Sequence, residues 1–200
     1  MWFITFRKAV LAGIAIGLGG YAFLVAGGLP GAVLFSFGLL TVVHYELALF
    51  TGKAGYFDSL KALGTLFGII LTGNVAGCLL MGVIAWPDIC GNDIAFVASQ
   101  NIVAKRLEAG FLANFILAIP CGFIMTTAVE FGRKKHFLPL LFGVPLFIMC
   151  GFRHSIADAF YYLVACVFSY KLVLIWLLIV AGNFIGCNLY RAVLYDNSKL

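Results

Sequence analysis

The chain has 200 residues, of which 64% are apolar or aromatic and only 10% are charged. A soluble domain carries about 25% charged residues, so this composition excludes a water-soluble globule, and its apolar content excludes a disordered chain. The formal net charge of +5 does not indicate nucleic-acid binding, because the basic residues are scattered along the sequence. A membrane-spanning helix needs roughly 20 apolar residues, so six spans would take about 120 residues and leave about 80 for connections. We therefore predict an all-α membrane protein, either with six spans and short loops or with fewer spans and some buried broken segments.

Six apolar runs follow one another along the chain. Four are uninterrupted and predict spans 1, 3, 4 and 6 at about 9–26, 62–86, 110–129 and 172–193. The second run starts at Ala32 and is interrupted by polar residues between His44 and Lys53. The fifth run starts at Phe137 and is interrupted between residues 151 and 158. The polar stretch from Pro87 to Arg106 is expected to be a solvated connection on the outer side, with room for a short interfacial helix.

Lys and Arg are unevenly distributed between the two sides of these predicted spans. Nine lie on the side of the N-terminus: Arg7, Lys8, Lys53, Lys61, Arg133, Lys134, Lys135, Arg191 and Lys199. Three lie on the other side: Lys105, Arg106 and Lys171. Short loops rich in Lys and Arg stay in the cytoplasm. We therefore predict a multi-pass protein of the cell membrane with both termini cytoplasmic, and with the basic triplet at residues 133–135 against anionic lipid.

The two halves of the sequence resemble each other. Spans 3 and 6 share the pattern GNxxGC, at residues 73–78 and 182–187, and spans 2 and 5 are both interrupted. Because each half has three spans, an odd number, the second copy must cross the membrane in the opposite direction. The sequence thus predicts one channel domain over residues 1–200, an inverted 3+3 repeat of about 1–100 and 101–200, with broken second and fifth helices. In such folds the matching breaks form the substrate site near the membrane midplane.

The polar residues in the two breaks are the candidates for a site, because polar groups at membrane depth are buried in protein or line a cavity. His154 can supply a hydrogen bond or a proton near neutral pH. Thr51 is expected to cap the half-helix that follows it. Phe50 and Phe152 are candidates for apolar constrictions. Asn74, like its counterpart in span 6, Asn183, is expected to stabilise helix packing and not to line the pore.

Three charged residues, Glu46, Arg153 and Asp158, lie in or beside the same breaks. Glu46 and Arg153 could pair across the two halves, or Glu46 could cap a helix while Arg153 reaches the outer aqueous mouth. No phosphate-binding, serine-hydrolase or zinc-protease motif occurs, and the six cysteines lack the spacing of a metal site. We therefore expect no enzymatic activity, no metal and no cofactor.

The motifs around these breaks resemble those of the formate/nitrite transporter family, in the right order along the whole chain. They are the LFTG of residues 49–52, the GFRHSIAD of residues 151–158 and the two GN motifs. The resemblance implies an aquaporin-like fold, a homopentamer with one pore per protomer, and passage of formate, nitrite or hydrosulfide. It places Leu49, Phe50 and Thr51 in the loop that breaks span 2, Phe152 at a constriction and His154 at the centre of the pore.

The chain departs from the family pattern at three positions. Ala48 replaces the acid before LFTG, Arg153 replaces the acid before the histidine, and Asp158 replaces an asparagine. All three substitutions change the charge beside the expected pore.

These observations predict a channel or proton symporter for small monovalent anions of weak acids. A bare anion faces a cost of tens of kcal/mol in a medium of low dielectric, and a proton or strong hydrogen bond from His154 would reduce this cost. Two alternatives remain open at the level of sequence. One is a channel for water, ammonia or a small amide, gated by His154 and Asp158. The other is a non-conducting relative whose pore is closed by a pair between Glu46 and Arg153.

Overall fold

The computed structural model describes the backbone of residues 2–91 and 93–194 and the side chains of 2–86 and 94–194. Lys199, counted above on the side of the N-terminus, lies outside the described residues. All the elements of the described chain are helices: α1 (Trp2–Ala26), α2 (Gly28–His44), α3 (Phe50–Lys53), α4 (Leu60–Thr65), the π-helix η1 (Leu66–Leu71), α5 (Thr72–Gly91), α6 (Asp93–Arg133), α7 (Leu138–Met149), α8 (Ser155–Val164), α9 (Tyr170–Cys187) and α10 (Leu189–Leu194). The prediction of an all-α protein is confirmed.

Four helical stretches are long and apolar enough to cross a membrane: Trp2–Ala26, Leu60–Trp86, Ile94–Arg133 and Tyr170–Leu194. Three shorter apolar helices, α2, α7 and α8, occupy the second and fifth predicted runs. About half or less of each long stretch is buried inside the protomer. The remaining apolar surface suits contact with lipid or with another protein chain, because water would not favour it.

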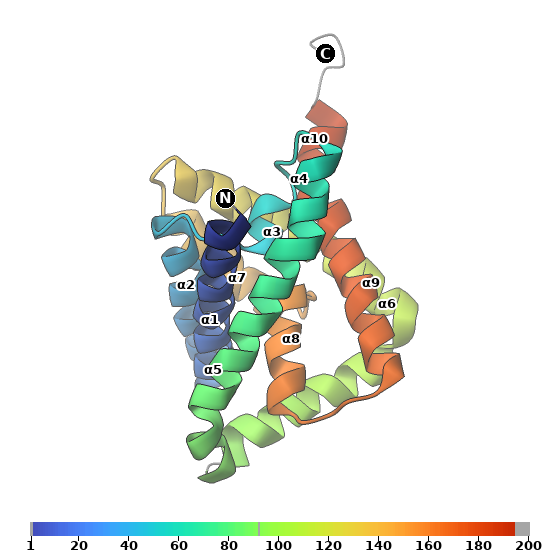
Figure 1. Ribbon diagram of the computed structural model, residues 1–200. Coiled ribbons are helices and arrows are strands. Elements are labelled where there is room, and N and C mark those ends of the chain that lie inside the picture. The colour runs from blue at the N-terminus through green and yellow to red at the C-terminus, as the bar shows by residue number, and fades with distance from the viewer. Residues whose placement is uncertain (1, 92, 195–200) are drawn as a thin grey trace.

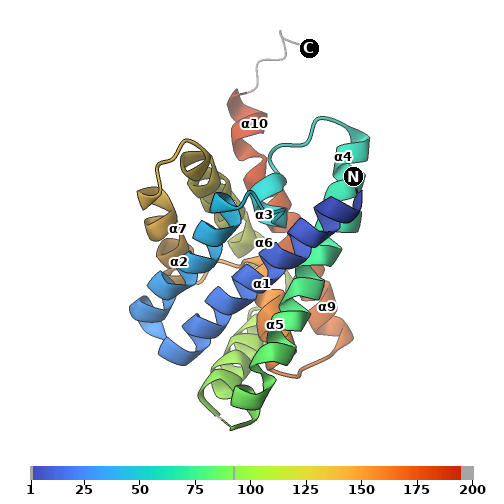
Figure 2. The ribbon, with the colours of Figure 1, turned by 60° about the vertical axis from the view of Figure 1, so that its left-hand side comes forward.

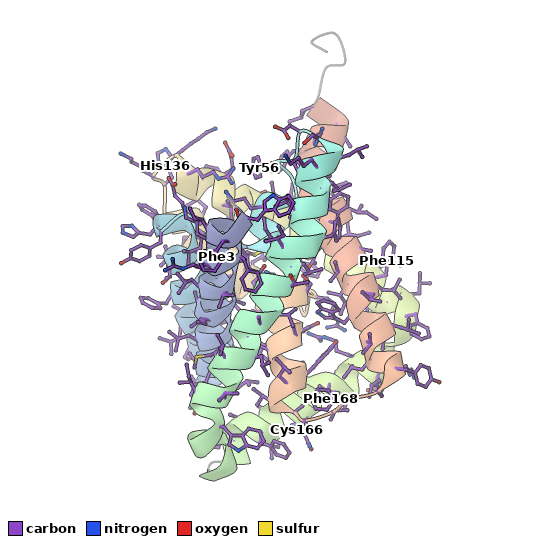
Figure 3. The ribbon with its side chains drawn as sticks, viewed as in Figure 1. Phe3, Tyr56, Phe115, His136, Cys166 and Phe168 are labelled. Carbon is purple, nitrogen blue, oxygen red and sulfur yellow. The ribbon has the colours of Figure 1, made fainter. Side chains whose placement is uncertain are left out.

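The start of α1 and the end of α10 lie toward the same end of the bundle (Figure 1). We call this end the terminal side; Tyr56 and His136 lie toward it, whereas Cys166 and Phe168 lie at the opposite end, the far side (Figure 3). Helix α1 packs against α2 and α5, and α6 packs against α9 and α7. Helix α8 lies between them at the centre (Figure 2), where every residue except Leu163 is buried.

Helix α6 differs from the prediction for this region. The sequence favoured a solvated connection up to Arg106 and a span starting at Gly110. Instead α6 is already helical from Asp93, and Ser99 and Arg106 are buried. Gly110, with φ 73° and ψ −170°, makes the turn between a first part along the far side and a second part that crosses the bundle (Figure 1). A positive φ of this kind is easily adopted only by glycine.

The GNxxGC motifs bring pairs of helices into backbone contact. In α5, a Cβ added at Gly77 would overlap the carbonyl oxygen of Val10 in α1. In α9, a Cβ added at Gly186 would overlap the carbonyl oxygen of Ile119 in α6. Small residues allow such close approach between membrane helices. The two motifs therefore set the α1–α5 and α6–α9 distances in the same way.

This packing generates a testable prediction about two glycines of the same helix. Gly77→Ala forces α5 away from α1, and overpacking of this kind costs about 1–3 kcal/mol. Gly82→Ala meets nothing within 4 Å and should leave stability unchanged or raise it by up to about 1 kcal/mol, because alanine favours the helix. Thermal unfolding of the detergent-solubilised variants measures both. Equal melting temperatures for the two variants would contradict the close contact.

Candidate functional site

Residues 45–49, between α2 and α3, form what we call the first junction, and Asn74 of α5 holds its backbone. The Oδ1 atom of Asn74 accepts a hydrogen bond from the Phe50 N–H (2.8 Å). Its Nδ2 donates to the carbonyl oxygens of Ala9 and Ala48, at 2.8 Å each. Asn74 is fully buried. This side chain therefore joins α5, α1 and the first junction at one point.

Residues 150–154, between α7 and α8, form the second junction, and Asn183 of α9 holds it in the same way. Its Oδ1 accepts from the Ser155 N–H (2.8 Å). Its Nδ2 donates to the carbonyl oxygens of Ala118 (2.8 Å) and Arg153 (2.7 Å). Because both amide hydrogens of each asparagine bind backbone oxygens, neither asparagine has a donor left for a solute.

Two cysteines of the same motifs connect the halves to each other. The thiol of Cys78 approaches the carbonyl oxygen of Ile156 in α8 (3.5 Å). The thiol of Cys187 approaches the carbonyl oxygen of Thr51 in α3 (3.3 Å). Each motif thus holds its own junction through its asparagine and touches the opposite short helix through its cysteine. As a result, the two junctions meet inside the bundle.

His154 and Thr51 form the contact where the junctions meet. The His154 Nε2 lies 3.1 Å from the Thr51 Oγ1, and both side chains are almost completely buried. The other ring nitrogen, Nδ1, accepts a hydrogen bond from the Ala157 N–H (3.1 Å) and so caps α8. A nitrogen that accepts a hydrogen bond must keep its lone pair. The cap therefore favours neutral His154 with its hydrogen on Nε2, donating to Thr51 and leaving the Thr51 hydroxyl hydrogen for another acceptor.

The role predicted for Thr51 as a helix cap is wrong. Leu49 occupies the N-cap position of α3, which has no side-chain cap hydrogen bond. The Thr51 hydroxyl instead faces His154 across the junctions. The residue that does cap a short helix is His154, a function that the sequence did not suggest. Histidine is not among the usual capping residues, so no residue-type signal pointed to it.

Phe147 covers His154, and Phe35 packs behind Phe147. The Phe147 ring stacks on the His154 ring with 5.5 Å between centroids. Phe35 of α2 meets Phe147 edge-on at 6.0 Å, and both phenylalanines are buried. Neither residue could be singled out from the sequence, because each lies in the apolar part of its run before the polar break, in a chain with 20 phenylalanines.

The two phenylalanines singled out in the sequence lie elsewhere. The Phe50 ring is buried against Phe67 of η1, at 5.4 Å between centroids. Phe152 is half-buried in the second junction. Leu49 is fully buried at the end of the first junction.

The charged residues near the second junction are paired differently from the expectation. The Arg106 Nε and Nη2 donate to the Asp158 carboxylate at 3.0 and 2.9 Å, and both side chains are buried. The Arg153 Nε donates to the Asn114 Oδ1 (3.0 Å), and its Nη1 donates to the Gly151 carbonyl oxygen (2.6 Å).

The pair between Glu46 and Arg153, one of the two alternatives from the sequence, does not form, and Arg153 is buried, not at an aqueous mouth. Glu46 is exposed, with φ 50°, and lines a cavity on the terminal side. This cavity has a volume of about 830 Å³ and reaches Ala48 and Gly52 at the first junction. Four basic side chains line it: Lys8, Lys53, Arg133 and Lys135. With one acid against four bases, its potential is positive, which attracts anions.

Beside this cavity, side-chain contacts join the segment between α3 and α4 to α6 and to the end of α9. The Tyr56 hydroxyl donates to the Glu130 carboxylate (2.8 Å), and Arg133 lies over the Tyr56 ring at 4.0 Å. Burial and the Glu130 carboxylate raise the pKa of Tyr56 to about 12, so the hydroxyl remains a donor at physiological pH. Asn188 donates to the Ala54 carbonyl oxygen (2.9 Å). In the described part of the chain, no group of three or more His, Cys, Asp or Glu side chains is placed to hold a metal ion.

Comparison with known proteins finds solved structures of similar fold. The fold matches a structure titled "Pentameric formate channel with formate bound", with a TM-score of 0.83, 20% identity, and 97% of this chain and 96% of that chain covered. It also matches an "FNT family ion channel", with a TM-score of 0.77, 15% identity, and 97% of this chain and 88% of that chain covered. No curated protein sequence matches the chain.

The family model described as "Formate/nitrite transporter" matches residues 1–196. The chain therefore belongs to the formate/nitrite transporter family, as the sequence motifs indicated, and it is a multi-pass membrane protein.

The asparagine contacts lead to a second testable prediction. Asn183→Ala leaves the Ser155 N–H and two carbonyl oxygens without their partner, and each buried unpaired group costs about 1–3 kcal/mol. We therefore expect a severe loss of thermal stability in detergent. Asn188→Ala, at the residue that follows the end of α9, removes hydrogen bonds from a half-buried side chain and should cost about 1 kcal/mol. A similar loss in both variants would argue against the anchoring role of Asn183.

Proposed function

We propose that this protein is a channel for small monovalent anions of weak acids, such as formate or nitrite, and that permeation is coupled to protons at His154. Membership of the formate/nitrite transporter family supports the substrate class. The observation that carries the proposal is the buried contact of His154 with Thr51 and Phe147, where the two junctions meet. The basic cavity on the terminal side supports the preference for anions.

We propose six spans in an inverted 3+3 repeat within a single domain. The spans are α1; α2 with α3; α4, η1 and α5; α6 after Gly110; α7 with α8; and α9. The matching contacts of Asn74 and Asn183, and of Cys78 and Cys187, support this arrangement because they join equivalent helices and junctions.

We further propose a homopentamer with one pore per protomer, in line with the pentameric structure of similar fold. The basic cavity on the terminal side suits a cytoplasmic location of both termini in the cell membrane, because basic residues are retained there. Lipid would then cover the apolar surface that other protomers leave exposed.

The mechanism follows from the cost of dehydrating an anion. The four basic side chains concentrate anions on the terminal side, near the first junction. At the junctions, the Thr51 hydroxyl hydrogen and the His154 Nε2–H are donors for the anion oxygen. Beside them the Phe147 ring, stacked on His154 and met edge-on by Phe35, forms an apolar barrier, which a neutral acid crosses at far lower cost than an anion.

The contacts of His154 also define what a proton transfer requires. To release a proton from Nε2, the ring must first become an imidazolium, which places a hydrogen on Nδ1 and breaks the hydrogen bond from the Ala157 N–H. An N-cap of this kind contributes about 1 kcal/mol. This is small beside the tens of kcal/mol for a bare anion in a medium of low dielectric. When Nε2 gives its proton to the anion, the ring becomes the neutral tautomer with its hydrogen on Nδ1. The starting tautomer and its cap return when Nε2 takes up a proton from water and Nδ1 releases its own.

The direct test is acid-stimulated uptake of formate into proteoliposomes. His154→Asn retains a hydrogen-bond donor but cannot supply a proton, so uptake should no longer rise with external acidity. Thr51→Val removes the hydroxyl at constant shape and should reduce uptake about tenfold, the effect of one hydrogen bond to a charged group. Thr51→Ser is the matched control and should retain most of the uptake. A folded His154→Asn protein with unchanged pH-dependent uptake would refute the role of the histidine.

The basic cavity gives a further prediction, about ionic strength. Lys135→Gln removes one exposed charge from the cavity and should lower the initial rate of formate uptake from the terminal side about twofold at low salt. Lys171→Gln removes the same charge outside this cavity and should leave that rate unchanged. At about 1 M salt, where the Debye length is about 3 Å, the difference should disappear. A deficit of Lys135→Gln that is independent of salt would contradict an electrostatic effect.

A further inference from the structure

Three charged side chains are buried together where α6 meets α8. Arg106 lies in the first part of α6, on the far side of the bundle (Figure 1), Asp158 in α8 and Arg153 in the second junction. None of the three is more than 8% exposed. Arg106 and Asp158 are joined by two hydrogen bonds, so together they carry no net charge. The charge of the cluster is therefore the charge of Arg153.

Arg153 is a buried cation without a counter-ion in the described part of the chain. Its two hydrogen-bond acceptors, the Asn114 Oδ1 and the Gly151 carbonyl oxygen, are neutral groups. A guanidinium remains protonated in proteins, and the effective penalty for burying an ion is several kcal/mol. A single negative charge at this place would remove the imbalance.

Two buried hydroxyl groups beside this cluster, those of Ser155 and Tyr162, have hydrogens that no described residue accepts. Ser155, Asp158 and Tyr162 follow one another at helical spacing and so lie on one face of α8. Tyr162 is close enough to Arg106, Asp158 and Arg153 to interact with all three electrostatically, and its oxygen faces the Arg106 guanidinium as an acceptor. Buried hydroxyls are normally hydrogen-bonded, so these two are free to bind a ligand.

We propose that Arg153, with the Ser155 and Tyr162 hydroxyls, forms a binding subsite for one small carboxylate or oxyanion on the far side of His154. The proposal rests on the proposed function, because it adds an intermediate site to the same permeation path. The guanidinium can donate two hydrogen bonds to such an anion in one plane, and the hydroxyls can donate one each. The family pattern has an acid where this chain has Arg153. The subsite is therefore a feature of this chain and not of the family pattern.

The test is formate binding to the purified full-length protein in detergent and chloride-free buffer. The indole of Trp176 donates to the Ser155 carbonyl oxygen (2.8 Å), so tryptophan fluorescence reports on the subsite. Arg153→Gln removes the unbalanced charge and should weaken binding more than roughly tenfold, the effect of a charged hydrogen bond. Arg153→Lys retains the charge but not the planar guanidinium with its two parallel N–H donors, and should weaken binding by only a few fold.

A double variant provides the matched control for charge. Arg106→Gln with Asp158→Asn removes a neutral pair and leaves Arg153 in place, so formate affinity should stay within about threefold of the original. Ser155→Ala with Tyr162→Phe deletes two hydroxyls whose hydrogens have no acceptor among the described residues. This variant should fold as well as the original chain and bind formate about tenfold more weakly. It keeps the test decisive if Arg153→Gln fails to fold.

Two results would overturn the subsite: unchanged formate affinity in folded Arg153→Gln, or unchanged affinity in the double hydroxyl variant. Formate uptake by the unmodified protein, measured in parallel, separates this failure from that of the proposed function. Uptake with unchanged binding in the variants refutes the subsite alone. Absence of both uptake and saturable binding in the unmodified protein refutes the subsite and the anion channel together.

Discussion

The backbone leaves regular helical hydrogen bonding at two places inside an apolar bundle, and two asparagine side chains supply the partners that it loses. Within the hydrocarbon region of a membrane, each unpaired backbone group costs several kcal/mol. Asn74 and Asn183 each bind one N–H and two carbonyl oxygens. Without them, the first amides of α3 and α8 would have no acceptor. The site between the two junctions depends on this arrangement, because it fixes the start of both short helices.

The asparagines also explain why histidine and threonine can face each other. Phe50 and Ser155, whose N–H groups they bind, are direct neighbours of Thr51 and His154. The second contact of His154, its cap on the Ala157 N–H, orients the ring. Phe147 then covers one face of the ring. Three separate contacts thus hold the imidazole in one orientation, which a donor aimed at a passing anion requires.

Much of the fold and of the site's position could be predicted from the sequence, because composition and repeated motifs indicate them directly. The all-helical class, the two GNxxGC motifs and the polar interruptions beside Thr51 and His154 depend on composition and spacing alone. The side-chain pairs could not be predicted. Arg106 appeared to belong to a solvated connection, since nothing in its neighbourhood shows that α6 starts early and turns at Gly110. Its pairing with Asp158 leaves Arg153 with neutral acceptors. Glu46 does not reach Arg153, because Glu46 is exposed at the cavity on the terminal side and Arg153 is buried.

The thiols of Cys78 and Cys187 have a consequence for how the chain is made. Each lies against the short helix of the opposite half, so each half supplies part of the surroundings of the other's junction. During synthesis the N-terminal half emerges first, and Thr51 has neither His154 nor Cys187 to contact until almost the whole chain has been translated. The contacts of the first junction are therefore complete only after the residues up to Cys187 have been synthesised. The two halves share a sequence pattern, but neither can complete its junction without the other.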